Sequence, residues 1–322
     1  MDSSDSKCLK IIDSHTAGEP TRVVVSGGPV VPEIGAAAAS EYLRDHADWM
    51  RRCLIDEPRG FEAVVGAFLC EPLDTDCIVG VVFFNNAGYL HSCIHGMIGV
   101  MQTLRHLGRI EAGVHKVETP IGTLRVKMDD QEKVTVENVP SYRLAERISV
   151  EAEGFGKITG DVAWGGNWFF LISEQGPAVK KAGIEELIRF TKAVRRGLLA
   201  EKVVGDDGHP VDHVEVFAKA EEGVCADSQN FVLCPGGAYD RSACGTGTSA
   251  KVACLAADGA LAEGEIYRQA GILGEVFEAQ YRAMGEKVVP SISGRAWITA
   301  ESRVVIHSDD PFRYGAGTEL SL

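Results

Sequence analysis

Along most of the chain, hydrophobic and polar positions alternate or form short apolar runs, and this pattern predicts short β-strands. The strand-like segments include residues 64–70, 78–84, 114–118, 124–128, 134–136, 158–163, 169–172, 214–217 and 231–233, with more up to residue 306. Helical spacing is found in segments 36–53, 96–107, 184–199 and 246–255. Residues 11–25 predict a strand, a loop and a strand. Short strands around a single apolar helix, in both halves, predict an α+β fold of two similar lobes.

The two most apolar helices begin in a similar way. Cys93-Ile94-His95-Gly96 opens the helix of the first half, and Cys244-Gly245-Thr246-Gly247 opens that of the second half. The spacing between the two cysteines is almost half of the 322 residues. A weak internal duplication would therefore place these cysteines opposite each other across a cleft between lobes.

Composition narrows the class of protein. A length of 322 residues predicts two domains, and 45% apolar with 24% charged residues is typical of a globular protein. A net charge of −14 would repel phosphate backbones and anionic membranes, so neither nucleic acid nor a membrane is an expected partner. None of the nine cysteines lies in a Cys-x-x-Cys pair, and the chain shows no signal peptide or apolar run of transmembrane length. We therefore expect a cytoplasmic protein.

A cysteine at a helix N-terminus has distinctive chemistry. Unpaired N–H groups and the helix dipole favour the thiolate there, and the thiol pKa can fall from about 8.5 to about 7 or lower. The same N–H groups bind a carboxylate. At neutral pH one such thiol could then be a base while its partner remains an acid. Two such thiols on either side of an amino acid's Cα would remove a proton from one face and return one to the other, which inverts the stereocentre.

Other interpretations remain open from the residues alone. Most of the other cysteines are expected to be small buried hydrophobes, and His15, His95 and His213 could each be structural. The Cys and His spacings match no compact zinc motif, so no metal is expected. A cysteine hydrolase would need a His base and an oxyanion hole rather than a second thiol. A protein that binds an amino acid without turning it over would use the same cleft.

Five motifs resemble those of the proline racemase family. They are DSHTAGEPT at residues 13–21, EPRG at 57–60, NAGYL at 86–90 running into Cys93, GGNWF at 165–169, and DRSACGTGTSA at 240–250. Within the family, NFVLCPGGAY at residues 230–239 is most similar to the 4-hydroxyproline 2-epimerases. The resemblance covers nearly the whole chain, and the segment around Cys244 is long enough to be highly specific.

The resemblance implies a fold and an activity. The family has a diaminopimelate-epimerase-like fold, with two pseudo-symmetric lobes, a central helix in each, and the active site in the cleft between them. The expected lobes are residues 1–130, completed by a C-terminal strand at about 303–322, and residues 131–302. The implied reaction converts trans-4-hydroxy-L-proline to cis-4-hydroxy-D-proline without pyridoxal phosphate or metal. A small-molecule substrate is the expected partner, and a homodimer is a further expectation.

The resemblance also assigns roles to single residues. Cys93 and Cys244 would be the acid/base thiols on the two faces of the substrate ring. The implied substrate-binding residues are Ile94, His95, Gly96, His213, Asp240, Gly245 and Thr246. Proline-specific members have aromatic residues at the positions of Val65 and Cys234. The smaller residues here leave room for a ring hydroxyl, which Ser92 or His213 would bind.

Three positions depart from the family pattern, and rival activities follow from the same resemblance. Ile94 and Met97 stand where the family usually has Gly and Thr, and Ala243 stands in place of the usual Pro before the second cysteine. Proline racemase is the main alternative activity. A trans-3-hydroxyproline dehydratase is a weaker one, because that branch has Thr where this chain has Cys244.

Overall fold

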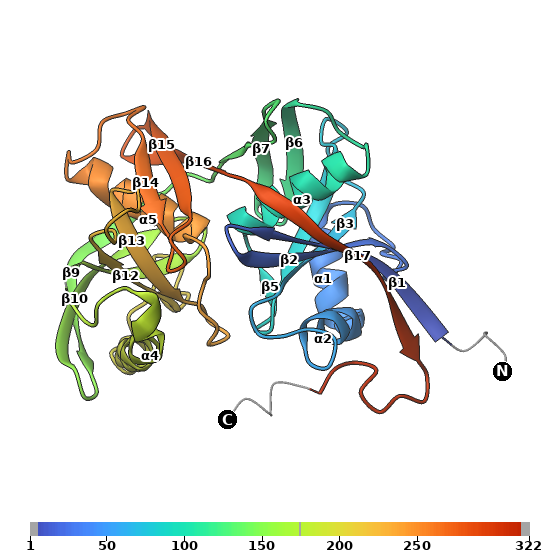
Figure 1. Cartoon of the computed structure of the whole chain (residues 1–322), viewed down its shortest axis with the longest axis horizontal. Helices are drawn as coiled ribbons and strands as arrows, with labels where there is room; N and C mark the ends of the chain where they lie inside the picture. Colours follow the sequence, from blue (N-terminus) through green and yellow to red (C-terminus); the bar gives the residue numbers. More distant parts are fainter. Residues whose placement is uncertain (1–5, 174, 317–322) are drawn as a thin grey trace. The chain divides into compact units, whose positions relative to one another are not determined.

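The computed structural model describes residues 6–173 and 175–316 (Figure 1). The chain divides into two compact units. Unit 1 contains Met1–Val134 and Arg295–Leu322, and unit 2 contains Thr135–Gly294. Of the C-terminal segment expected to complete the first lobe, residues 317–322 lie outside the described residues.

Unit 1 is built on a mixed sheet in the order β17–β1–β2–β3–β4–β6–β7, with β5 also paired to β4. Its strands are β1 (Ser6–Thr16), β2 (Glu19–Ser26), β3 (Val65–Cys70), β4 (Val79–Phe84), β5 (Tyr89–Leu90), β6 (Gly113–Thr119), β7 (Gly122–Met128) and β17 (Ala296–His307). The pairs β2–β3 and β4–β6 are parallel, so each needs a crossover connection. The first crossover contains α1 (Ala36–His46) and α2 (Trp49–Ile55), and the second contains α3 (Ile94–His106).

Unit 2 has a second mixed sheet, in the order β9–β10–β11–β12–β13–β14–β15–β16–β8. Its strands are β8 (Val134–Glu137), β9 (Tyr142–Ala152), β10 (Gly156–Trp164), β11 (Trp168–Ser173), β12 (His213–Ala218), β13 (Ser228–Leu233), β14 (Tyr267–Ala270), β15 (Val276–Met284) and β16 (Lys287–Gly294). The parallel pair β11–β12 is joined through the short η2 (Lys181–Gly183) and α4 (Ile184–Ala200). The parallel pair β13–β14 is joined through α5 (Gly245–Ala257).

The two units share one succession of elements. Each has an antiparallel hairpin, a helical crossover to a parallel strand, an antiparallel neighbour, a second helical crossover and a final hairpin. In this succession α3 and α5 occupy the same place, as the second crossover of their unit.

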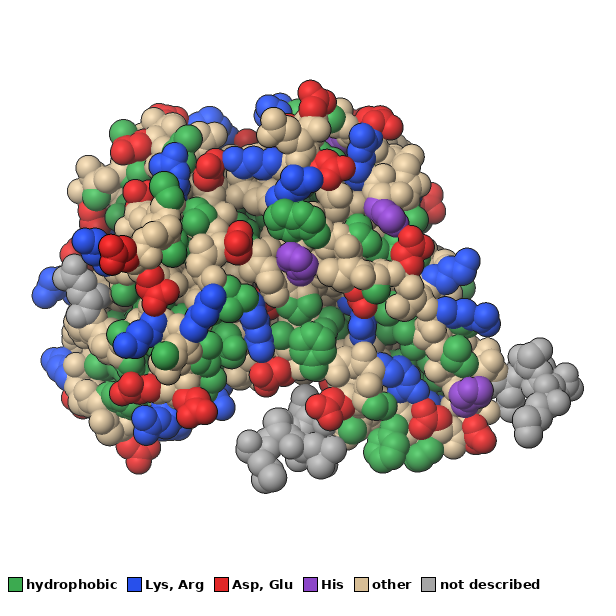
Figure 2. All heavy atoms as spheres, viewed as in Figure 1, with side chains coloured by type: hydrophobic (Ala, Val, Ile, Leu, Met, Phe, Trp, Pro, Cys, Tyr) green, Lys and Arg blue, Asp and Glu red, His purple; other side chains and the backbone are tan. Residues whose placement is uncertain are grey.

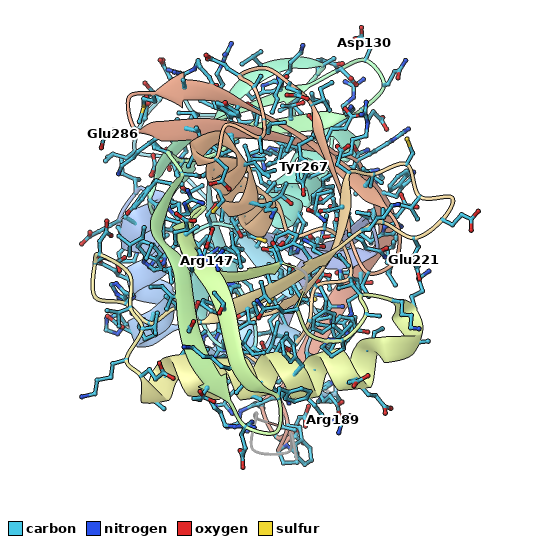
Figure 3. All side chains as sticks on the ribbon, turned by 90° about the vertical axis from the view of Figure 1, so that its left-hand side faces the viewer. Asp130, Arg147, Arg189, Glu221, Tyr267 and Glu286 are labelled. Carbon is cyan, nitrogen blue, oxygen red and sulfur yellow. The ribbon has the colours of Figure 1, made fainter. Side chains whose placement is uncertain are left out.

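The sheet of unit 2 has a separate hydrophobic core on each of its two faces. Phe170, Val214 and Phe231 pack in a cluster with the apolar side chains of α4. Their chain neighbours Phe169 and Val232 pack instead with the apolar side chains of α5. Successive side chains of a strand point to opposite faces, so α4 and α5 cover opposite faces of this sheet. In Figure 3 Tyr267 lies among interior side chains, whereas Arg189 of α4 and Glu286 lie at the periphery.

Three of the four predicted helices are confirmed, with bounds within two residues of the prediction. The predicted helix 36–53 is instead two helices, interrupted at Ala47 and Asp48. The predicted loop within residues 13–22 is wrong, because β1 and β2 form a hairpin. Its two-residue turn, Ala17-Gly18, has positive φ at both positions, and such turns match the twist of paired strands.

The face of the molecule in Figure 2 carries acidic and basic side chains interspersed with one another. The helices within residues 6–173 and 175–316 are all too short or too polar to cross a membrane.

Candidate active site

Helix α3 begins at Cys93. This residue has extended backbone angles, and its carbonyl accepts the first helical hydrogen bond, from the Met97 N–H at 2.9 Å. The N–H groups of a helix's first turn have no carbonyl partner within the helix, so they are available to an anion. The side chains from Ile94 to Leu104 are buried, and Cys93 is 7% exposed. The thiol therefore lies at the start of a helix enclosed by the core of unit 1.

Residues of the DSHTAGEPT motif contact helix α3. The Thr16 hydroxyl donates a hydrogen bond of 3.0 Å to the carbonyl of His95, in the first turn. Further along, α3 approaches the hairpin so closely that a Cβ on Gly99 would lie 2.9 Å from Ser14 Oγ. The motif therefore fixes the position of the helix that carries Cys93.

Cys93 is in contact with an imidazole. Its Sγ lies 3.4 Å from Nδ1 of His95, which is itself 8% exposed. A histidine next to a cysteine favours the thiolate when the imidazole is protonated. The thiol and the imidazole are thus within hydrogen-bonding distance of each other.

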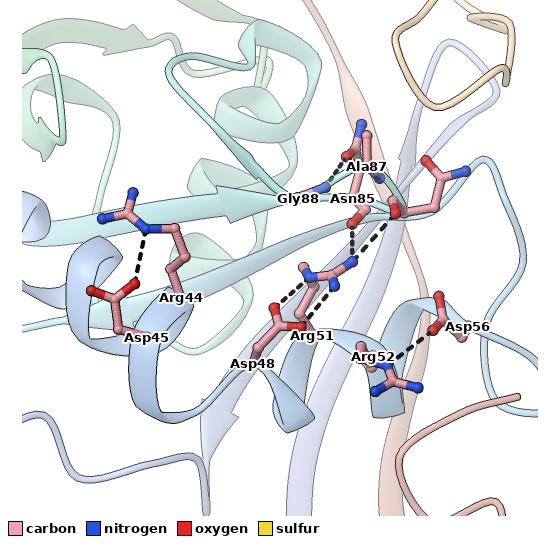
Figure 4. A network of polar contacts seen from close by, with 10 residues as sticks. Arg44, Asp45, Asp48, Arg51, Arg52, Asp56, Asn85, Ala87 and Gly88 are labelled. Atoms are coloured by element: carbon pink, nitrogen blue, oxygen red, sulfur yellow. Dashed lines mark hydrogen bonds and ion pairs between the residues drawn. The ribbon is translucent and has the colours of Figure 1, made fainter. Parts of the chain in front are cut away.

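The segment that leads to Cys93 is held by Arg51 (Figure 4). Arg51 forms an ion pair with Asp48 and donates to the carbonyls of Asn85 and Asn86 at 3.0 and 3.3 Å. The Asn85 side chain accepts hydrogen bonds from two backbone N–H groups of the same turn. This network anchors the β4–β5 turn, part of the NAGYL motif, to helix α2.

Two expected wall residues lie in unit 1. Val65 opens β3 and is 7% exposed. Ser92, next to Cys93, is 3% exposed, and its Oγ has no hydrogen-bond partner among the residues that the structure describes. A buried hydroxyl without a partner is energetically unfavourable, so Ser92 is suited to bonding a ligand.

Helix α5 begins at Cys244 in the same manner. The Cys244 carbonyl accepts from the Thr248 N–H at 2.7 Å, and Cys244 is 8% exposed. The GGNWF motif lies against the first turn. Asn167 donates to the Thr246 hydroxyl at 3.3 Å, and a Cβ on Gly165 would lie 2.1 Å from the Thr246 carbonyl oxygen. Only glycine permits that approach.

The loop before Cys244 holds Asp240 in place. The Asp240 N–H donates to the Val232 carbonyl at 3.1 Å, and its Oδ1 accepts from the Cys234 thiol at 3.0 Å. Arg195 of α4 donates to the carbonyls of Cys234 and Pro235 at 2.8 and 2.9 Å. Asp240 is 8% exposed, so the loop presents a carboxylate that is mostly enclosed by protein.

His213 lies at the start of β12 and is mostly buried. Its Nδ1 is 2.7 Å from Oδ1 of Asp212, and its ring packs on Phe169 with the centroids 4.7 Å apart. A carboxylate partner at Nδ1 orients the imidazole and leaves Nε2 as its second polar atom.

The surroundings of Cys244 shift the pKa of its thiol. Burial raises the pKa of this thiol above its usual range, and the nearby Asp240 and Glu215 carboxyl groups raise it further. This direction fits the member of the expected thiol pair that remains an acid. Removal from water disfavours the charged form of a thiol, so burial favours protonated Cys244.

Glu215 is a residue that the sequence-based prediction did not include. It is fully buried in β12, and burial raises its pKa to about 8. Its Oε1 accepts a hydrogen bond of 2.6 Å from Asn230 of β13. The signal in the sequence is one acidic residue in an otherwise apolar stretch, Val214–Ala218, and nothing local shows that the carboxyl group points inward.

Each unit thus gathers part of the predicted set. Unit 1 brings Ser92, Cys93 and His95 together at the start of α3. Unit 2 brings Asp240, Cys244 and Thr246 together at the start of α5. Each group combines a thiol, helix N–H groups and at least one further polar side chain, which are the components of a site for a carboxylate with an acidic C–H bond.

The chain is similar to several proteins named 4-hydroxyproline 2-epimerase. It is 48% identical to a 4-hydroxyproline 2-epimerase of Pseudomonas fluorescens over 316 residues, which cover 97% of this chain and 100% of the relative. It is 51% identical to a 4-hydroxyproline 2-epimerase of Burkholderia thailandensis over 315 residues, covering 96% and 99%.

Solved structures share its fold. A hydroxyproline epimerase from Agrobacterium vitis with bound trans-4-hydroxy-L-proline superposes with a TM-score of 0.85 at 24% identity, covering 98% of this chain and 96% of that one. A phenazine biosynthesis protein of the PhzF family from Bacillus anthracis superposes with a TM-score of 0.65 at 14% identity, covering 93% and 99%.

A family model described as proline racemase matches residues 11–317. That range includes all five motifs and both cysteine-led helices. Because the match extends over almost the whole chain and the curated relatives are about half identical to it, the chain belongs to the proline racemase family.

Proposed function

We propose that this protein is a 4-hydroxyproline 2-epimerase, which interconverts trans-4-hydroxy-L-proline and cis-4-hydroxy-D-proline. The observation that carries the proposal is that α3 and α5, which hold the same place in their units, each begin at a buried cysteine. Relatives named for this reaction support it, since they are about half identical over their whole length.

In this proposal the two units are the lobes of a diaminopimelate-epimerase-like fold, and the substrate binds in a cleft between them. The N–H groups of Ile94 and His95 and those of Gly245 and Thr246 hold the substrate carboxylate. Negative charge develops on that carboxylate when Cα loses its proton, so helix N-termini stabilise the intermediate more than the substrate. Gly96 allows close approach, and His95, His213 and Asp240 contact the ring.

The reaction needs one thiolate and one thiol. Cys93, beside His95, removes the Cα proton in one direction, and the electron pair of the C–H bond moves into the carboxylate. Cys244, whose pKa is raised, delivers its proton to the opposite face of Cα. The reverse reaction exchanges the two roles. Both proton-transfer groups belong to the protein, so the proposal requires neither pyridoxal phosphate nor a metal.

Ser92 accounts for the choice of a hydroxylated ring. Its buried Oγ, without a partner among the described residues, gains a hydrogen bond when a ring hydroxyl enters. Val65 and Cys234 form the rest of the wall and leave space for that hydroxyl.

A proton NMR assay in D₂O tests the proposal with three substrates: trans-4-hydroxy-L-proline, L-proline and trans-3-hydroxy-L-proline. The expected result is fastest turnover of the first, with deuterium at Cα of the cis-4-hydroxy-D-proline formed. Fastest turnover of L-proline would instead make the protein a proline racemase. Loss of water from the 3-hydroxy compound would make it a dehydratase. Absence of Cα exchange in all three would leave a binding protein.

A further inference from the structure

Glu215 lies on the face of the unit 2 sheet that α5 covers. It alternates with Val214 and Val216, whose side chains pack toward α4, so its own side chain points toward α5. A Cβ on Gly247, in the first turn of α5, would lie 2.1 Å from Glu215 Oε2. The carboxyl group therefore fits directly against the helix turn that follows Cys244.

The surroundings of Glu215 do not stabilise a negative charge. Oε1 accepts a single hydrogen bond from Asn230, and Oε2 receives none from the described residues. A carboxylate in full burial needs several donors or a cation, whereas a protonated carboxyl group needs less. The geometry therefore favours the neutral acid, in agreement with the raised pKa of about 8.

The four titratable groups around Glu215 come from three elements. Cys244 and Lys251 belong to the start and middle of α5, Asp240 to the loop before it, and Tyr267 to β14. The Lys251 ammonium lies over the Phe217 ring and donates to Ser173, so it is engaged elsewhere. Asp240 and an ionised Glu215 would both disfavour a thiolate at Cys244.

We propose that Glu215 is a positioning residue for Cys244: as a neutral acid it supports the first turn of α5 at Gly247 without adding a second negative charge near the thiol. When Glu215 loses its proton, the thiolate of Cys244 becomes less favourable. The catalytic meaning of this coupling rests on the proposed epimerase function, but the coupling itself is a property of the thiol and is measurable without substrate.

The test compares alkylation of Cys244 by iodoacetamide in the wild-type protein and in Glu215→Gln, with the labelled peptides quantified by mass spectrometry. Gln has nearly the same shape and stays neutral. The exposed Cys225 in the same unit is the internal reference for reagent and pH. Rates are measured at about pH 6.5 and about pH 9.5, on either side of the Glu215 pKa of about 8.

The expected ratio of variant to wild-type rate at Cys244, normalised to Cys225, is about 1 at the lower pH and about three- to tenfold at the higher pH. A merely structural role would change the rate equally at both pH values, which would overturn the proposal. No labelling of Cys244 in either protein would overturn it too, because the coupling requires a thiol that ionises.

Asn230→Ala provides a second variant if Glu215→Gln does not fold. It removes the hydrogen bond that lowers the pKa of Glu215, so Glu215 stays neutral to higher pH and Cys244 labels faster than in the wild type near pH 8. An unchanged rate would contradict the proposal. If the wild-type protein showed no epimerase activity in the NMR assay but the labelling followed the prediction, the proposed function would be refuted. The role of Glu215 would then remain supported.

Discussion

The thiol of Cys234 donates a hydrogen bond of 3.0 Å to Oδ1 of Asp240. Cys234 is thus more than a small residue that leaves space in the pocket. It also orients the carboxylate four residues before Cys244, and Arg195 fixes the backbone of the same loop. A substitution at Cys234 will therefore change both the pocket volume and the direction of Asp240.

Replacing both Val65 and Cys234 with Phe should lower kcat/KM for 4-hydroxyproline more than for proline, by about tenfold or more in the ratio. Overfilling removes space that only the hydroxylated ring uses. The control is Cys234→Ser, which keeps a donor for Asp240 at nearly unchanged volume and should leave the ratio as it is. Equal losses on both substrates in the Phe variant would show that these positions do not form the specificity wall.

Ser92→Ala should reduce kcat/KM for trans-4-hydroxy-L-proline by about tenfold and leave that for L-proline nearly unchanged, because one hydrogen bond to the ring hydroxyl is lost. Ser14→Ala is the matched control. Ser14 also has a buried Oγ without a partner among the described residues. It lies next to Gly99, in the middle of α3, rather than next to Cys93. Steady-state kinetics on both substrates measure the effect. Equal changes of kcat/KM in Ser92→Ala and Ser14→Ala would contradict the role of Ser92.

Cys93→Ser and Cys244→Ser should each lower epimerisation by about a thousandfold or more, since a hydroxyl is far too weakly acidic to replace the thiol. Each variant should still exchange the Cα proton of the one epimer that faces the surviving thiol. NMR in D₂O measures both processes separately. Epimerisation near the wild-type rate in either variant would exclude that cysteine as an acid/base group.

Glu215→Gln should change how stability depends on pH. The folded-state pKa of Glu215, about 8, lies above the ordinary value of 4.5, so its contribution to stability is fully present below about pH 4.5 and is lost as the pH rises through about 8. The variant has no such loss. Its free energy of unfolding, relative to wild type, should therefore increase between pH 5 and pH 8, by up to about 4 kcal/mol.

Denaturant unfolding at several pH values measures this difference. Glu221→Gln, at an exposed position in the same unit (Figure 3), is the control and should follow the wild-type curve. A Glu215→Gln curve parallel to wild type over this range would show that Glu215 keeps an ordinary pKa in the folded protein.

Local sequence predicted the features that depend on short-range physics. The apolar spacing predicted α3, α4 and α5 within two residues, because helix periodicity and a Gly-rich start are encoded in adjacent residues. It also placed Cys93 and Cys244 at helix starts, and each is indeed the residue before the first helical turn. The family followed from motifs that are contiguous in the chain.

The tertiary structure decided the features that depend on partners far away in sequence. The pairing of β1 with β17 joins segments that lie almost 300 residues apart, so no local pattern predicts it. Burial raises the pKa of Cys244, and the side chains that pack with it include Phe169 of β11 and Val232 of β13. Burial against α5 raises the pKa of Glu215. Burial is a property of the packed chain, so the sequence alone determined which groups are present, and only the fold determined their charge.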